Sequence, residues 1–416
     1  MAAIRTSLTR FGLAMLVALV VLGACPRGDA QDIMLPDPNY QPRVKKPKPK
    51  RDVLPAAPQQ LPAFSIPVAP LGFGSPSATY LGRQYSLMSL DFLDEKRLLF
   101  SFRAPGLLAR DASESSGDRQ MKAVVLKLPE GTVESQTLWT LSDRLPYLWM
   151  LQDGHFLLRD HEGLKIGDAS LQNKPVLNLS GEFQNLQINP EGTVAAVQSL
   201  ERMSPTPNAA LNVVTRVVQL RNGQVETSHS SSVSELPVNS DGFLAITHDN
   251  KYDLWSLKLT SFSNDTRLLG HIRSNCLPIA AFLSDQKILV SGCNPYHIPT
   301  LQAVSTSGHV LWETETPVAP IPPLLITTPS DSRFARESII FKKVPSAGSE
   351  ILWVKAVRGQ VVRVFDSATG KAALEVPIKP IFDAGGNVAI SPSGRRVAIL
   401  NGGAIQVFEL PTPPVN

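Results

Sequence analysis

The sequence has few aromatic residues, few charged residues and few cysteines, and it lacks long helical periodicity. Aromatic residues make up 6% of its 416 residues and charged residues 18%, and it has only three cysteines. Beyond the first 25 residues, no long segment repeats its apolar residues with the 3.6-residue helical period, which excludes a helical bundle. Apolar residues still amount to 43%, enough for a sizeable core, so a wholly disordered chain is also excluded.

Common catalytic motifs are missing as well. The chain has no Gly-x-Ser-x-Gly elbow, no phosphate-binding glycine-rich loop, no His-Glu-x-x-His and no Cys-x-x-Cys-His. One cluster has the side-chain types that bind divalent ions: Asp153, His155, Asp160, His161 and Glu162. Its acidic residues fall at predicted turns, where polar side chains form local hydrogen bonds. We therefore expect no cofactor, and His155, His161 and Asp160 are the candidates if a metal binds.

Positive charge is concentrated near the N-terminus. Nine basic and three acidic residues precede residue 52, whereas the rest of the chain has 31 basic and 33 acidic residues. The remainder therefore lacks the basic excess of a nucleic-acid-binding protein, and we expect no nucleic-acid partner. The basic run from Arg43 to Arg51 could contact anionic lipid or cell-wall polymers, but we interpret it as a solvated linker.

The first 30 residues have the pattern of a secretory signal peptide. Arg5 and Arg10 precede a 14-residue apolar run, which is shorter than the roughly 20 residues of a membrane-spanning helix. Two processing sites remain open. Small residues ending at residue 30 suit a signal peptidase, whereas Leu-Gly-Ala-Cys ending at Cys25 resembles the bacterial lipobox, with residues 1–24 removed and Cys25 lipidated. Both predict export to the bacterial periplasm, cell envelope or extracellular space, and a lipidated Cys25 predicts membrane association.

Residues 31–76 are rich in proline and lysine. Proline removes backbone donors and favours extended neighbours, so this segment cannot form a packed helix or a central strand. We predict a disordered, semi-rigid stalk.

The other two cysteines, Cys276 and Cys293, flank two apolar runs joined at Ser284-Asp285. The midpoint of their numbers falls in that turn, so a tight hairpin would place them opposite each other across its strands. We predict a disulfide between them, as suits an exported protein; two free buried thiols are the alternative.

From residue 77 to 412, pairs of apolar runs recur around Ser, Pro, Asp or Gly turns, most clearly at 186–197, 238–247 and 388–400. Each pair predicts a β-hairpin. Seven turn positions recur at an average interval of about 50 residues, close to the period of four-stranded propeller blades. The turn positions are Asp94, Asp153, Glu191, Asp241, Asp285, Asp331 and Ser393.

These repeats predict an all-β protein, a seven-bladed β-propeller of four-stranded blades, with six or eight blades as alternatives. The last blade is one strand short, and an N-terminal strand within 78–88 is expected to close the ring. Residues 413–416 form a tail. Five tryptophans, each following a leucine, are expected to pack between blades.

The segment 361–378, with Asp-x-x-Thr-Gly-Lys between two strands, resembles the bacterial exported YVTN/WD40-like β-propeller repeat proteins. The resemblance implies the fold and no particular activity. We expect a monomeric, non-enzymatic cell-envelope binding or scaffold protein that recognises a protein or a surface glycan through a propeller face. The alternative is a metal-dependent hydrolase or lactonase of the propeller type, which predicts that acidic residues of several blades converge on the central axis.

Overall fold

The computed structural model describes most of the chain after residue 59. The described ranges are 60–74, 88–104, 118–142, 146–179, 181–202, 211–220, 224–229, 236–249, 253–316, 325–328, 330–342, 355–381 and 385–412. The predicted signal peptide, Cys25, the basic run and the tail lie outside them. Within these ranges, no helix has the length and hydrophobicity needed to cross a membrane.

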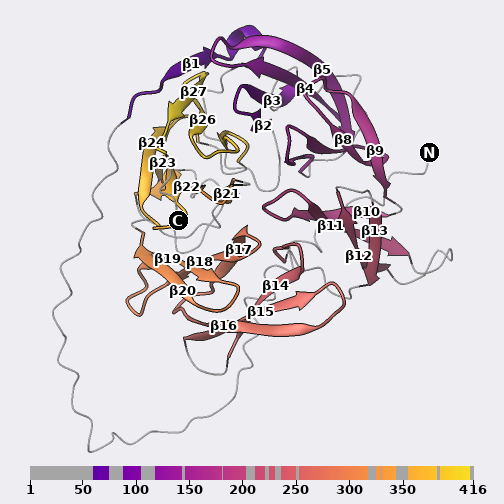
Figure 1. Cartoon of the computed structure of the whole chain (residues 1–416). Helices are drawn as coiled ribbons and strands as arrows, with labels where there is room; N and C mark the ends of the chain where they lie inside the picture. The colour runs from indigo at the N-terminus through magenta and orange to yellow at the C-terminus, as the bar shows by residue number, and fades with distance from the viewer. Residues whose placement is uncertain are drawn as a thin grey trace, which may run out of the picture. The chain divides into compact units, whose positions relative to one another are not determined.

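The described residues form seven antiparallel sheets, arranged as the blades of a propeller (Figure 1). Each blade proceeds outward along the chain from its innermost strand, except that the outermost strand of the last blade comes from the N-terminal side of the sequence. The arrangement confirms the predicted fold class and the count of seven. We number the blades I to VII in chain order.

Blades I to III follow one another from residue 88 to residue 229. Blade I contains β2 (Met88–Asp94), β3 (Arg97–Ala104), β4 (Asp118–Lys127) and β5 (Thr132–Ser142). Blade II contains β6 (Leu148–Met150), β7 (Phe156–Arg159), β8 (Gly163–Gly167) and β9 (Asn173–Asn178). Blade III contains β10 (Glu182–Ile188), β11 (Val194–Arg202), β12 (Leu211–Gln219) and β13 (Gln224–His229).

Blades IV to VII complete the ring. Blade IV contains β14 (Gly242–His248), β15 (Leu254–Ser261) and β16 (Thr266–Arg273), and blade V contains β17 (Ile279–Ser284), β18 (Lys287–Cys293), β19 (Pro299–Ser305) and β20 (Val310–Glu315). Blade VI contains β21 (Leu325–Thr327), β22 (Arg333–Phe341), β23 (Val357–Asp366) and β24 (Ala372–Ile378). Blade VII contains β25 (Val388–Ile390), β26 (Arg396–Asn401), β27 (Ala404–Glu409) and β1 (Phe64–Pro67).

Blade IV departs from the predicted four strands. Its innermost position is occupied by a single β-bridge, Val238 to Phe243, so that β14 corresponds to the second strand of the other blades. Asn239 explains this local structure, because its side-chain oxygen accepts hydrogen bonds from the backbone of Asp241 (3.0 Å) and Gly242 (2.9 Å). Asn and Asp favour turns for this reason, and here the turn begins immediately after the bridge.

The ring closes through β1, as the missing last strand predicts, but the strand is not the expected one. Residues 64–67 pair antiparallel with β27, and they lie inside the predicted stalk 31–76 rather than within 78–88. The predicted domain start at residue 77 is therefore too late. A four-residue strand between prolines has a weak sequence signal, because proline is tolerated at the edge of a sheet, where β1 lies.

The segment after β1 connects blade VII to blade I. A short 3-10 helix, η1 (Ala69–Leu71), leads to Phe73, whose ring packs edge-to-face on Phe100 and Phe102 with centroids 5.3 Å away in both cases. Lys122 donates a hydrogen bond to the carbonyl oxygen of Leu71 (2.9 Å). We call residues 64–73 the clasp, since they extend blade VII and pack against blade I.

Buried apolar side chains fill the spaces between neighbouring blades. Within the described ranges, six clusters each join two adjacent blades. Three tryptophans confirm the expected packing between blades, through the pairs Trp139–Phe156, Trp149–Phe183 and Trp312–Phe334. Trp255 packs against the cluster between blades IV and V, and Trp353 lies outside the described residues.

Six of the seven predicted turn positions lie between the first and second strand segments of a blade, and Asp94 is the last residue of the first strand of blade I. Several of these turns contact one another. The contacts are Ser240 N to Asp285 (3.2 Å), Lys287 to Asp331 (2.8 Å), Ser332 to the Ser393 carbonyl (3.3 Å) and Ser393 N to Glu95 (2.8 Å). We call this set of turns the turn ring.

Candidate functional site

Successive connections of a blade lie at opposite ends of the propeller, because successive strands run in opposite directions. One end carries the turn ring. The other end carries the connections between second and third strands and the connections between blades, and we call it the loop face. The disulfide lies at the loop face of blade V.

The predicted disulfide between Cys276 and Cys293 is present, with Cα atoms 5.5 Å apart. The expectation that the two cysteines face each other directly across the strands is wrong, because the turn lies one residue later than predicted. It lies at Asp285 and Gln286, between the paired residues Ser284 and Lys287, and the register that pairs Ile279 with Ser291 leaves the two cysteines offset by one residue. The ladder ends at the pair Ile279–Ser291, so Cys276 lies in the loop before β17. The disulfide therefore ties the blade IV–V connection to the end of β18.

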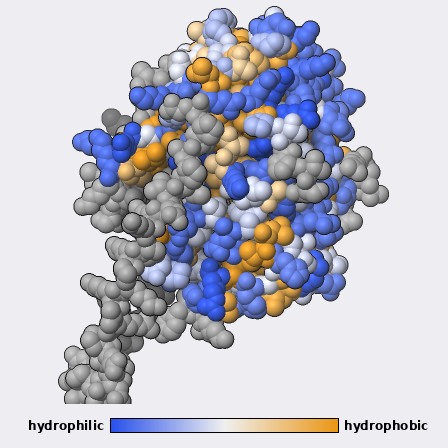
Figure 2. Space-filling model, turned by 60° about the vertical axis from the view of Figure 1, so that its left-hand side comes forward, coloured by the Kyte–Doolittle hydropathy of each residue, from blue (hydrophilic) through white to orange (hydrophobic). Residues whose placement is uncertain are grey.

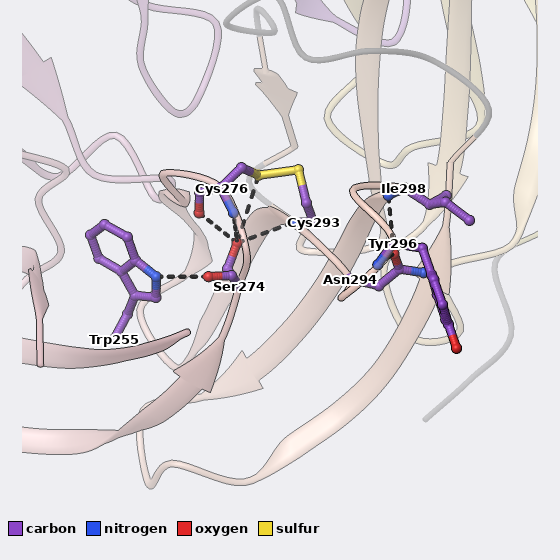
Figure 3. The surroundings of a disulfide bond; sticks show 7 residues. All are labelled: Trp255, Ser274, Cys276, Cys293, Asn294, Tyr296 and Ile298. Carbon is purple, nitrogen blue, oxygen red and sulfur yellow. Dashed lines mark hydrogen bonds between the residues drawn. A yellow bond between two sulfur atoms is a disulfide. The ribbon is translucent and has the colours of Figure 1, made fainter. Parts of the chain in front are cut away.

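Ser274 reinforces this attachment (Figure 3). Its hydroxyl donates to the carbonyl oxygen of Cys276 (2.7 Å) and accepts from the backbone N–H of Cys293 (3.0 Å). Its own carbonyl oxygen accepts from the indole N–H of Trp255 (3.0 Å), so blade IV also contacts the attached loop. Asn275 N–H donates to the carbonyl oxygen of Cys293 (3.0 Å).

The adjacent β18–β19 loop is ordered by Asn294. Its side-chain oxygen accepts hydrogen bonds from the backbone of Tyr296 (2.9 Å) and Ile298 (3.0 Å), and its amide donates to Glu315 (2.7 Å). Figure 3 shows the Tyr296 ring directed away from the Asn294 side chain and the disulfide.

Large apolar side chains are exposed on these two loops and at the adjoining start of β17. Leu277 is 74% exposed, Tyr296 66% and Ile279 44%. We call these three residues the loop patch. Isolated exposed apolar residues are ordinary, and Figure 2 shows hydrophobic residues scattered over a mainly hydrophilic face. The loop patch differs because its two loops are held by a disulfide and by side-chain hydrogen bonds.

The structure does not bring the candidate metal ligands together. His155 lies in the turn before β7, whereas Asp160 and His161 follow that strand at its other end. Asp160 pairs with Lys165 (2.6 Å), and His161 pairs with Asp118 of blade I (3.1 Å). No group of three or more His, Cys, Asp or Glu residues is placed to hold a metal in the described part of the chain.

A serine, an aspartate and a histidine meet on blade IV. The Ser256 hydroxyl lies 2.8 Å and 2.9 Å from the two carboxylate oxygens of Asp249, and His271 Nδ1 lies 3.0 Å from Asp249 and 3.2 Å from Ser256. The hydrogen bond from Ser256, assisted by His271, lowers the pKa of Asp249. In a catalytic triad the serine gives its proton to histidine Nε2 and the acid orients Nδ1. Here the hydroxyl donates to the carboxylate, so the geometry does not activate Ser256.

Asp91 is the acidic residue in the middle of an innermost strand. Its carboxylate accepts a hydrogen bond from Ser89. Nearby, the fully buried Tyr147 is hydrogen-bonded to Ser101 (2.8 Å), and the Arg119 guanidinium lies 5.1 Å from the Tyr147 ring centroid. Burial raises the pKa of Asp91 to about 6 and also raises the pKa of Tyr147.

We expect Asp91→Asn to change how stability depends on pH. Because the folded state raises the pKa of Asp91 from 3.8 to about 6, Asp91 favours folding at low pH, and this contribution is lost as the pH rises through that interval. The variant should gain up to about 3 kcal/mol relative to the parent between pH 4 and pH 7. Urea unfolding at each pH measures this difference. If the free energies of unfolding of the two proteins changed with pH in parallel, the raised pKa of Asp91 would be contradicted.

The sequence matches no family model and no curated protein. Similar solved structures include a chain of the mitotic checkpoint complex, with 13% identity and a TM-score of 0.44 over 91% of this chain and 99% of that one. The β-propeller domain of the Trilobed protease from Pyrococcus furiosus has 11% identity and a TM-score of 0.43 over 79% and 94%. Acylaminoacyl peptidase from Pyrococcus horikoshii has 11% identity and a TM-score of 0.46 over 77% of this chain and 52% of that one. Such likenesses concern the fold alone.

Proposed function

We propose that this β-propeller is a non-enzymatic binding module that recognises a partner protein through the loop patch. The observation that carries the proposal is that the side chains of Leu277, Ile279 and Tyr296 are exposed next to a disulfide that holds their loops. Preordered loops bind with a smaller loss of conformational entropy, and tyrosine is enriched among residues that dominate binding energy.

The chemistry of the loop patch favours a protein over a glycan. Two of its three side chains are aliphatic and offer no hydrogen-bonding group. Sugar hydroxyls buried against them would lose their bonds to water without replacement, which is unfavourable. Apolar and aromatic side chains of a partner protein would instead gain from the burial.

The hydrolase alternative has no specific support in the described residues. It requires acidic side chains from several blades to converge on the axis. The innermost strands β6, β17, β21 and β25 contain no acidic residue, and β10 contains only Glu182, at its first position. Asp91 of β2 accepts a hydrogen bond from Ser89, and no described group of three or more acidic, His or Cys side chains is placed to hold a metal.

We also propose that the protein is exported and acts in the bacterial cell envelope as a monomer. The charged start, the apolar run and the two processing sites of the sequence support this location. A lipidated Cys25 would attach the propeller to a membrane through the proline-rich segment. Mass spectrometry of the mature protein tests the choice between a lipidated Cys25 and an N-terminus at residue 31.

We expect substitutions in the loop patch to abolish partner binding without unfolding the protein. The double variant Leu277→Ser/Tyr296→Ala should reduce recovery of a specific envelope protein by at least about thirtyfold, since hot-spot truncations cost about 2 kcal/mol or more. Surface changes of this kind alter stability by about 0.5 kcal/mol or less. The measurement is quantitative affinity capture from the native envelope fraction.

The matched control is Leu138→Ser, which removes a similarly exposed leucine (61%, against 74% for Leu277) from blade I. Recovery should be unchanged in this control and should survive enzymatic deglycosylation of the extract. Equal recovery with both variants, or loss of recovery on deglycosylation, would overturn the proposal.

A further inference from the structure

Arg336 of β22 is a partly buried arginine that forms no ion pair within the described part of the chain. Its Nε atom is buried and has no hydrogen-bonding partner, and none of the ion pairs in the described ranges involves this residue. The Nε atom of the buried Arg333 also lacks a partner, but its guanidinium donates to the carbonyl oxygen of Pro411 (3.0 Å), and that of the buried Arg159 donates to Pro146 (3.1 Å).

Strand periodicity places Arg336 between blades V and VI. Alternate residues of a strand point to the same face of the sheet. Phe334, two residues before Arg336, packs with Leu289 and Leu301 of blade V. Arg336 therefore points toward blade V, beyond this apolar cluster and toward the loop face.

A second arginine lies directly opposite. Arg336 pairs in register with Arg363 of β23, so the two side chains share one face of blade VI. Arg363 is already engaged, because its guanidinium contacts both carboxylate oxygens of Glu375 at 2.8 Å and 3.3 Å. Arg363 is paired with Glu375, so of the two arginines only Arg336 has donors that no carboxylate in the described residues accepts.

The position of Arg336 disfavours the folded state. Burial, with the nearby positive charge of Arg363, lowers the pKa of Arg336 to about 10. An arginine remains charged under physiological conditions, so the structure retains an unpaired cation in a partly desolvated position. Groups that disfavour folding are common at binding sites, because the ligand supplies the missing interaction.

We propose that Arg336, at the interface between blades V and VI, binds an oxyanion group, a carboxylate or a phosphate, of a ligand. The guanidinium presents a planar set of donors that matches two oxygens of such a group. The nearby Arg363 adds a favourable field without taking part in the contact. This site is separate from the loop patch, and neither proposal depends on the other.

The test titrates the full propeller with succinate and, separately, with inorganic phosphate, at constant ionic strength set with chloride. The Nε–Hε signal of Arg336, identified by its absence in Arg336→Met, should shift with saturation in at least one titration. Preference for succinate or phosphate distinguishes the two oxyanion sources. Linear, unsaturated shifts in both titrations would overturn the proposal.

The variants add an independent readout. Without added oxyanion, Arg336→Met should melt at a temperature equal to or above that of the parent, and it should lose the stabilisation by the bound oxyanion. The matched variant Arg363→Met should melt at a lower temperature, because it leaves Glu375 unpaired. A lower melting temperature of Arg336→Met, with unchanged stabilisation by the oxyanion, would identify Arg336 as a structural residue and refute the assignment.

Discussion

Removal of residues 1–74 is expected to leave a chain that no longer forms a stable propeller. The truncation removes the outermost strand of blade VII and four buried side chains that fill the space between blades VII and I: Ile66, Val68, Leu71 and Phe73. Truncation of one large buried side chain costs about 2–5 kcal/mol. Loss of four therefore costs about 8–20 kcal/mol, which is as large as the total stability of most domains, about 5–15 kcal/mol. Far-UV circular dichroism and size-exclusion chromatography measure the outcome.

Two controls isolate the clasp from the segment before it. A chain that begins at residue 60 retains β1, η1 and Phe73, and it should unfold at the same denaturant concentration as the chain that begins at residue 31. A synthetic peptide of residues 60–74 should restore folding of the truncated chain in a concentration-dependent manner. Normal folding of the chain that begins at residue 75 would show that the clasp is dispensable.

Loss of the Cys276–Cys293 disulfide is expected to destabilise the protein by about 3 kcal/mol. The bond closes a loop with a sequence separation of 17, and the chain-entropy estimate for a loop of this length has that size. Urea unfolding of the parent and of Cys276→Ser/Cys293→Ser measures the difference. Hydrogen exchange should also accelerate in residues 274–279, because the loop patch would lose its covalent attachment.

A reducing agent provides the matched condition. It should lower the unfolding midpoint of the parent to that of the double serine variant and leave the variant unchanged. The variant Ser274→Ala should cause a smaller loss, since it removes hydrogen bonds to Cys276 and Cys293 and retains the covalent bond. Equal stability of the parent and the double serine variant would contradict the expected role of the disulfide.

The sequence predicts the repeated hairpins well because their signals are local. Each of the seven turn positions, from Asp94 to Ser393, combines a turn-forming residue with flanking apolar runs, and each lies between strand segments in the structure or, for Asp94, at the end of the first strand. The clasp was not predicted because its strand is short and its partner, β27, lies more than 300 residues away. Proline content identifies the surrounding segment as non-helical but does not distinguish a stalk from an edge strand.

In the candidate sites, too, local features can be predicted from the sequence and features that depend on the folded structure cannot. The disulfide pairing could be predicted from the spacing of Cys276 and Cys293, but the exact turn position and register that offset them by one residue could not. Exposure of Leu277 and Tyr296 depends on the loops that carry them, and apolar residues in a sequence are more often buried. Arg336 gives no sequence signal at all, since its lack of a partner follows from register and blade packing.

The turn ring has a consequence for the order in which the molecule assembles. The contacts Ser240–Asp285 and Ser332–Ser393 join residues separated by 45 and 61 positions, whereas Ser393–Glu95 joins residues separated by 298. Closing a sixfold longer segment costs only about 1.6 kcal/mol more in chain entropy, but contacts of such high sequence separation form slowly. We therefore expect an open arc of blades to form before the ring closes, with the contact of Ser393 with Glu95 and the pairing of β1 with β27 forming last.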